Sequence, residues 1–391
     1  MTSLPQADWT SREDLAALVA ALGPDHARYV GGAVRDTLLG KPINDIDVAT
    51  PLLPHAVIDR CKEAGIRTVP TGIDHGTVTA ILDGGPVEIT TLRHDVSTDG
   101  RRATVAFASD WREDAARRDF TINALYAHPQ TLEISDYFGG LADLEARHVR
   151  FIGDARERIR EDHLRILRYY RFQARFGDAP DAEAVAACSE LAHTLKGLSR
   201  ERVAMELLGI LALPGAVGAI GLMQEHGVLP VILPEARERE RVVFAGLIDH
   251  EAATGTEGDP VRRLAALLPP IASVAEAVSA RLRLSRTQRA RLVCAAERKD
   301  SDSEAPRALA YAEGIECARD RLLIAGAAIR DLEDWTVPEL PLKGGEIVQR
   351  GVGAGPEVAR VLRAVEARWI AEQFPARDRV LELLDEELAA L

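Results

Sequence analysis

GGAVRD at residues 31–36, followed closely by DIDV at residues 45–48, is the segment of this chain that says most about its architecture. A glycine pair lets the backbone approach a phosphate closely, because neither residue carries a Cβ and both can adopt positive φ. Arg35, inside the first segment, can neutralise the same anion with its planar guanidinium group. If the second segment is a short strand, Asp45 and Asp47 lie on the same face, because side chains alternate along a strand.

Two neighbouring carboxylates repel each other unless a cation joins them, and Lys41 is the nearest cationic residue in the sequence. Mg²⁺ prefers oxygen ligands and binds phosphates alongside carboxylates. We therefore predict a site for metal-assisted phosphoryl or nucleotidyl transfer at Asp45 and Asp47. Glu88 is a candidate third carboxylate, and an ordinary exposed acid on a strand is an equally good interpretation of it. Taken alone, each segment is also typical of a plain turn or a polar strand end.

Together, the two segments at this spacing resemble the first motif of the class II tRNA nucleotidyltransferases. That family contains the CCA-adding enzymes and the bacterial poly(A) polymerases, and it belongs to the polymerase-β-like superfamily. The resemblance implies that Asp45 and Asp47 are catalytic and hold two Mg²⁺ ions about 4 Å apart. It also implies that Gly32 and Arg35 contact the incoming nucleotide.

The composition indicates a globular protein of two or three domains, given 391 residues. No window approaches the roughly 20 apolar residues of a membrane span, and the first residues lack the features of a secretory signal. We therefore expect a cytoplasmic protein with no membrane partner. The net charge of −13 argues against non-specific coating of nucleic acid. The arginines that cluster between residues 147 and 175 nevertheless predict a local basic cleft.

The four cysteines are widely spaced, which suits neither a zinc cluster nor a disulfide framework. They are Cys61, Cys188, Cys294 and Cys317. We predict four buried free thiols in a reducing compartment.

Residues 26–145 alternate strand and helix signals, which predicts a small mixed sheet with helices on one face. The predicted elements are a strand at 27–30, a helix at 34–39, a strand at 45–49, a helix at 54–63 and a hairpin of strands 77–82 and 86–92. Residues 94–117 are polar, with Asp99-Gly100-Arg101-Arg102 at their tip, and predict a long mobile loop.

From about residue 150 the pattern is helical to the end, with helices expected at 182–191, 202–213, 261–268 and 358–370. The predicted fold class is α/β followed by all-α. By resemblance this is a polymerase-β-like head with a mixed sheet at residues 1–145, a nucleotide-selecting helical neck at 146–215, and a tRNA-binding body and tail at 216–391. The glycine-rich residues 343–356 resemble the family's tail, although a plain turn between helices fits them nearly as well.

Residues 117–125, RRDFTINAL, predict a capped amphipathic helix. They also resemble the family's second motif, which favours ribonucleotides. This resemblance implies that Arg118 binds the nucleotide and makes Asp119 a candidate for contact with the ribose hydroxyls.

Residues 160–171, REDHLRILRYYR, predict one helix whose polar side carries Asp162, Arg165, Arg168 and Arg171. A carboxylate accepts hydrogen bonds and a guanidinium donates them, so Asp162 and Arg165 together match the edges of both cytosine and adenine. Uracil and guanine would leave unpaired polar groups, at a cost of about 1–3 kcal/mol each. The segment resembles the family's Glu-Asp-x-x-Arg motif, in which side chains replace a template. Arg168 and Arg171 would then contact base, ribose or triphosphate.

We therefore expect template-independent addition of C, C and A to the tRNA 3′ end from CTP and ATP, with Mg²⁺. A poly(A) polymerase or an enzyme adding only part of CCA is the alternative within the class. A non-catalytic tRNA-binding protein is the alternative from another class, and it would need neither Asp45, Asp47 nor Arg165.

Overall fold

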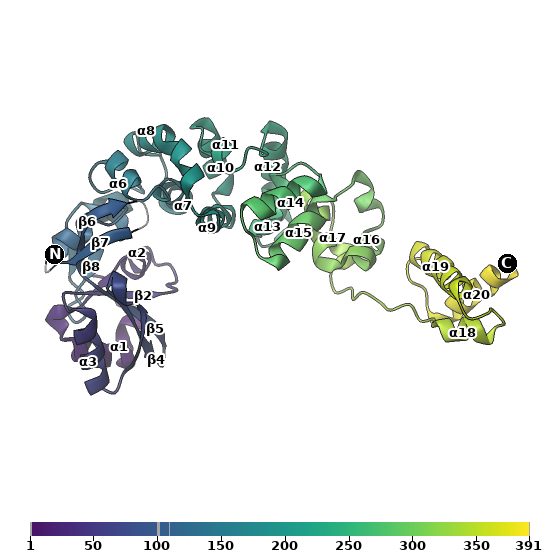
Figure 1. Cartoon of the computed structure of the whole chain (residues 1–391), viewed down its shortest axis with the longest axis horizontal. Coiled ribbons are helices and arrows are strands. Elements are labelled where there is room, and N and C mark those ends of the chain that lie inside the picture. The colour runs from purple at the N-terminus through teal and green to yellow at the C-terminus, as the bar shows by residue number, and fades with distance from the viewer. Residues whose placement is uncertain (1, 100–101, 109, 391) are drawn as a thin grey trace. The chain divides into compact units, whose positions relative to one another are not determined.

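The computed structural model describes residues 2–99, 102–108 and 110–390. The chain divides into two compact units, Met1–Ile232 and Leu233–Leu391. The predicted fold class is confirmed, because a mixed sheet with helices is followed by helices alone (Figure 1). The finer division at residues 145 and 215 stays a prediction. None of the described helices combines the length and the apolar character that a bilayer crossing demands.

The mixed sheet of the first unit has seven strands in the order β3-β4-β5-β2-β1-β8-β9. The strands of the protein are β1 (Arg28–Val30), β2 (Ile46–Thr50), β3 (Arg67–Gly72), β4 (Thr77–Leu82), β5 (Gly85–Thr91), β6 (Arg93–Asp99), β7 (Arg102–Phe107), β8 (Leu125–Ala127) and β9 (Ile134–Asp136). Strand β2 lies at the centre, parallel to β5 and antiparallel to β1. The predicted hairpin of β4 and β5 is confirmed.

Alternation along the central strands places successive side chains on opposite faces of the sheet. Val48 and Ile89 are register partners on β2 and β5, and both side chains are buried. The next pair toward the start of both strands is Asp47 and Glu88, which therefore lie on the opposite face. The sheet thus positions these two carboxylates side by side, on the face that also carries Val30 and Ala49 of a buried apolar cluster.

The α-helices of the first unit lie between, before and after the strands, and the last of them ends at Ile232. They are α1 (Glu13–Leu22), α2 (Gly32–Leu38), α3 (Pro54–Glu63), α4 (Trp111–Ala116), α5 (Gly140–Glu145), α6 (Ala155–Glu161), α7 (Arg165–Phe176), α8 (Ala182–Leu191), α9 (Arg200–Leu211), α10 (Ala216–Glu225) and α11 (Leu229–Ile232). Helices α1 and α3 pack on each other beside the sheet, and α3 contacts β3 and β4 (Figure 1). Helix α7 packs on α9 and α10, which joins the arginine-rich segment to a helical core.

The prediction of a long loop at residues 94–117 is wrong. Strands β6 and β7 pair antiparallel, from Arg93 with Phe107 to Asp99 with Arg102, and α4 follows. The β-branched residues in this segment favour strands, and Asp99-Gly100 is a common hairpin turn sequence. The loop prediction gave more weight to the overall polarity of the segment than to these two signals. Residues 100 and 101 of the predicted tip lie outside the described residues.

The second unit is built from helices. They are α12 (Glu238–Thr254), α13 (Pro260–Ala266), α14 (Ala272–Arg281), α15 (Arg286–Ala296), α16 (Pro306–Glu313), α17 (Ile315–Ile324), α18 (Gly344–Gln349), α19 (Pro356–Ala371) and α20 (Arg377–Ala389). The last three share an apolar cluster that includes Ile347, Val365, Trp369 and Leu383.

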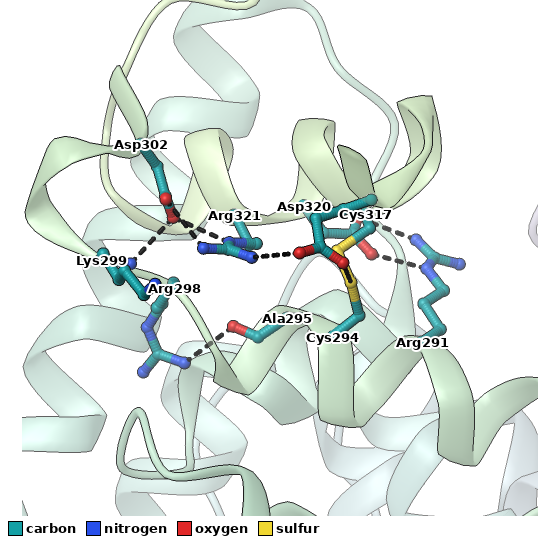
Figure 2. The surroundings of a disulfide bond; sticks show 10 residues. Arg291, Cys294, Ala295, Arg298, Lys299, Asp302, Cys317, Asp320 and Arg321 are labelled. Atoms are coloured by element: carbon teal, nitrogen blue, oxygen red, sulfur yellow. Dashed lines mark hydrogen bonds and ion pairs between the residues drawn. A yellow bond between two sulfur atoms is a disulfide. The ribbon is translucent and has the colours of Figure 1, made fainter. Parts of the chain in front are cut away.

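The prediction of four free thiols is wrong for two of them. Cys294 on α15 and Cys317 on α17 form a disulfide, whereas Cys61 and Cys188 are free and buried. Figure 2 shows the disulfide between two ion pairs, Arg291–Asp320 and Arg321–Asp302. A separation of 23 residues shows nothing about proximity, and only the packing of α15 on α17 brings the two Cα atoms to 6.0 Å.

Candidate active site

The predicted glycine turn lies between strand β1 and helix α2. Gly31 has φ 71° and ψ −125°, a backbone conformation that favours glycine. A Cβ built on Gly31 would lie 3.7 Å from Nη1 of Arg118 and 4.0 Å from Oδ2 of Asp47. The turn therefore passes directly beside a predicted metal ligand and a predicted nucleotide-binding residue.

Two of the three candidate carboxylates share one face of the sheet, and the third lies just before β2. Asp47 is on β2, Asp45 is exposed immediately before that strand, and Glu88 is the register partner of Asp47 on β5. Burial, together with the nearby charges of Glu88 and Asp45, raises the pKa of Asp47 to about 6, against the opposing effect of Arg118. Glu88 is next to Asp47 and is also exposed, so a third carboxylate of the site and an ordinary exposed acid both stay open as interpretations of it.

This crowding of negative charge fits a divalent cation, because a cation would offset both the burial and the repulsion. In the part of the chain that the structure describes, no three His, Cys, Asp or Glu side chains form a ready-made metal centre. The donor set instead suits a hard divalent cation that one or two carboxylates hold together with substrate phosphates.

Two side chains hold Arg118 beside the glycine turn. Its Nε donates to the hydroxyl of Tyr126 at 3.0 Å, and its Nη2 donates to Oδ2 of Asp114 at 3.1 Å. The predicted helix at residues 117–125 is wrong, because the segment forms a 3₁₀ turn at Thr121–Asn123 and then enters β8. The structure nevertheless brings Arg118 close to Asp47.

Arg35 lies in a buried pocket of the protein itself. Its Nε donates to Asp36 at 2.8 Å, and its guanidinium lies 4.2 Å from the centroid of the Phe176 ring. Burial lowers the pKa of Arg35, and Asp36 partly offsets that effect. Gly32 begins α2, and a Cβ built on it would lie 3.7 Å from Nη2 of Arg35. Arg35 therefore links the glycine turn, at Gly32, to Phe176 of α7.

A chain of hydrogen bonds connects Arg35 to the arginines of α7. Nη1 of Arg35 donates to Oδ1 of Asn123, whose amide donates to Asp119 at 2.9 Å. Nε of Arg168 donates to the other oxygen of Asp119 at 2.9 Å. Both carboxylate oxygens of Asp119 thus accept hydrogen bonds from the protein, and the second motif is tied to α7.

The prediction of one helix across residues 160–171 is wrong. Helix α6 ends at Glu161, and Asp162 has an extended backbone with φ −148°. The Asp162 carboxylate accepts a hydrogen bond from the backbone N–H of Leu164 at 3.1 Å, an alternative to helical bonding that Asp readily offers. Helix α7 then begins at Arg165.

Asp162 and Arg165 are three residues apart and contact different side chains. Asp162 pairs with Arg202 of α9 at 2.7 Å, whereas Arg165 pairs with Glu161 at 2.6 Å. Arg165 also donates to the carbonyl of Arg117 at 3.0 Å, which links it to the second motif.

Glu206 is a residue that the sequence reasoning missed. This acid on α9 is only 3% exposed, and it accepts hydrogen bonds from Arg171, the shorter at 2.6 Å, and lies 3.8 Å from Arg168. The available signal was the one acid within the apolar residues 203–211 of α9, because a buried acid requires a cationic partner. Local sequence around Arg168 and Arg171 contained no such partner.

The geometry can be compared with known proteins. A family model described as "Poly A polymerase head domain" matches residues 27–150, and one described as "Probable RNA and SrmB- binding site of polymerase A" matches residues 179–239. The mitochondrial CCA tRNA nucleotidyltransferase 1 of Mus musculus is 36% identical over 367 residues, which cover 88% of this chain and 82% of that protein. The chain belongs to the CCA tRNA nucleotidyltransferase family.

Other members of the family agree with this assignment. The CCA-adding enzyme of Levilactobacillus brevis is 44% identical over 187 residues, which cover 47% of this chain and 46% of that protein. The crystal structure of the Bacillus stearothermophilus CCA-adding enzyme in complex with CTP has a TM-score of 0.72 and 25% identity. The match covers 97% of this chain and 98% of that one. The predicted family, and the nucleotidyltransferase class that it implies, are confirmed.

Proposed function

We propose that this protein adds C, C and A in turn to the 3′ end of tRNA, using CTP and ATP and releasing pyrophosphate. The observation that carries the proposal is the close approach of Asp47 and Arg118 to the glycine turn, where both lie within 4.0 Å of the position of a Cβ on Gly31. A family likeness that extends over 88% of the chain supports the same reaction.

Asp45 and Asp47 would hold Mg²⁺, which when bound lowers the pKa of an attacking hydroxyl and neutralises charge on a triphosphate. The residues around Asp47 would orient the nucleotide. The turn at Gly31 and Gly32 allows close approach of backbone to the nucleotide, and Arg118 contributes a positive charge beside Asp47. Catalysis of this kind depends on positioning and charge stabilisation more than on covalent chemistry.

Asp162 and Arg165 would select cytosine and adenine by their hydrogen-bonding edges. In the structure both side chains pair within the protein, with Arg202 and Glu161. Reading a base therefore requires an exchange of partners, from these ion pairs to the base. Arg168 and Arg171 would complete the nucleotide pocket from the same helix.

The remaining assignments are part of the same proposal. Residues 146–215 would form the nucleotide-selecting neck, and residues 216–391 would bind the body of the tRNA. We propose that the protein acts in the cytoplasm, as the sequence predicts. Fractionation of the source cells, with activity followed in each fraction, would test that location.

Incubation of the protein with a tRNA that lacks its last three nucleotides tests the reaction. CTP and ATP are supplied singly and together, with Mg²⁺ or with EDTA, and products are resolved at single-nucleotide length. Addition that stops after CCA and requires Mg²⁺ supports the proposal. A long A tract would identify a poly(A) polymerase, one or two nucleotides a partial enzyme, and tRNA binding without extension a non-catalytic protein.

Arg165→Ala tests base selection separately. We expect discrimination against UTP and GTP to fall by about ten-fold or more, since each mismatched contact costs about 1–3 kcal/mol. The matched control is Arg160→Ala, an exposed arginine on α6 of the same segment, which should leave selectivity unchanged. Equal selectivity in Arg165→Ala and wild type would refute the proposed template.

A further inference from the structure

Asp114 is a buried acid that none of the proposed catalytic roles uses. It lies on α4, four residues before Arg118, and its side chain is only 1% exposed. A carboxylate this deeply buried is costly unless charged partners compensate it. Its contacts are therefore informative about what the site requires.

Asp114 and Tyr126 hold one edge of the Arg118 guanidinium. The Tyr126 hydroxyl donates to Oδ2 of Asp114 at 2.7 Å, and the same Oδ2 accepts from Nη2 of Arg118 at 3.1 Å. The hydroxyl in turn accepts from Nε of Arg118 at 3.0 Å. These three hydrogen bonds close a ring among three side chains, and they occupy the Nε and Nη2 edge of Arg118.

The remaining nitrogen of Arg118 is directed to the active site. Nη1 lies 3.7 Å from the position of a Cβ on Gly31, beside Oδ2 of Asp47. Because the guanidinium group is planar, fixing Nε and Nη2 also fixes where Nη1 points. The direction of Arg118 is thus set by residues behind it.

The charges of the ring support this arrangement. Burial alone would raise the pKa of Asp114, but Arg118 and Arg117 outweigh it and hold that pKa below its ordinary value. Burial alone would lower the pKa of Arg118. Tyr126 and Asp114 have the larger effect, and the pKa of Arg118 is raised. Burial raises the pKa of Tyr126, so its hydroxyl keeps the proton that it donates.

The sheet connects Tyr126 to the glycine turn. Tyr126 is fully buried on β8, and its register partner Val30 directly precedes Gly31. The Tyr126 ring also packs edge-on against Trp111, at 5.9 Å between centroids. The sheet therefore holds the hydroxyl of Tyr126 at a fixed position relative to the turn.

We propose that Asp114 and Tyr126 are positioning residues, which aim Nη1 of Arg118 at the phosphates of the incoming nucleoside triphosphate. This inference rests on the proposed function, because it requires Arg118 to meet the nucleotide. It assigns to two buried side chains a role in the reaction beyond packing.

A double-mutant cycle between Tyr126→Phe and Arg118→Ala tests the inference. Tyr126→Phe removes only the hydroxyl, and we expect kcat/KM for CTP addition to fall about ten-fold, as for loss of a hydrogen bond to a charged group. In the Arg118→Ala background the same change should cost less than about two-fold, because there is no guanidinium to aim. Equal losses in both backgrounds would overturn the proposal.

Tyr170→Phe is the matched control. Tyr170 is equally buried, and among the described atoms its hydroxyl has no hydrogen-bond partner, so removing it should leave kcat/KM unchanged. Asp114→Asn, in the same two backgrounds, gives a second cycle if Tyr126→Phe unfolds, and additive losses there would also overturn the proposal. A wild-type protein without CCA addition would refute the proposed function, whereas an active wild type with additive cycles would refute only the positioning role.

Discussion

Reduction of the Cys294–Cys317 disulfide should selectively destabilise the second unit. The bond joins α15 to α17 across 23 residues of sequence. In the chain-entropy treatment, closing a loop of this length in the unfolded chain stabilises the folded state by about 3 kcal/mol. The reduced protein should keep its native contacts, because the Arg291–Asp320 pair at 2.6 Å still holds α15 and α17 together. The loss should therefore appear in the free energy of unfolding.

Hydrogen–deuterium exchange followed by mass spectrometry measures this change locally. On addition of dithiothreitol, the protection of buried amides in α15 and α17 should fall by on the order of 100-fold, which corresponds to about 3 kcal/mol. Peptides of α8 in the first unit, where Cys188 is a free buried thiol, serve as the internal control and should not change.

A Cys294→Ser and Cys317→Ser double variant separates the disulfide from other effects of the reductant. It should exchange like the reduced wild type and should not respond to dithiothreitol. A fall in protection of less than about ten-fold in the wild type would refute the loop-closure reasoning. An equal response in the double variant would refute the assignment to this disulfide.

Three further substitutions test the site. Asp47→Asn should lower CCA addition by about 1000-fold, measured as single-turnover rate, while tRNA affinity in a filter-binding assay stays within about three-fold; normal turnover would remove the metal assignment. Glu206→Gln should lower the free energy of urea unfolding by about 2 kcal/mol, because Arg168 and Arg171 lose the charge that they pair with; an unchanged midpoint would contradict this. Gly31→Ala should cost about 2 kcal/mol of stability at φ 71° and reduce addition, and a stable, fully active variant would show that the turn tolerates a side chain.

Local signals predicted much of the first unit. The helix at Pro54–Glu63 and the strand at Thr77–Leu82 have the predicted bounds, as does the helix at Ala182–Leu191. Each depends on patterns within one element: proline at a helix start, β-branched residues, or apolar spacing at 3.6 residues. Where local signals conflicted, as in the polar hairpin of β6 and β7, sequence reasoning failed.

The family could be recognised from the chain alone by resemblance, because its motifs, such as the glycine pair and the two nearby aspartates, are runs of a few consecutive residues. Which charges and thiols meet could be learned only from the folded molecule. Glu206 with Arg171, and Cys294 with Cys317, lie 35 and 23 residues apart, and folding alone brings them into contact. A buried charge needs a partner close to it in space, and a disulfide needs two thiols that the fold brings together, so these partners follow from packing and not from spacing along the chain.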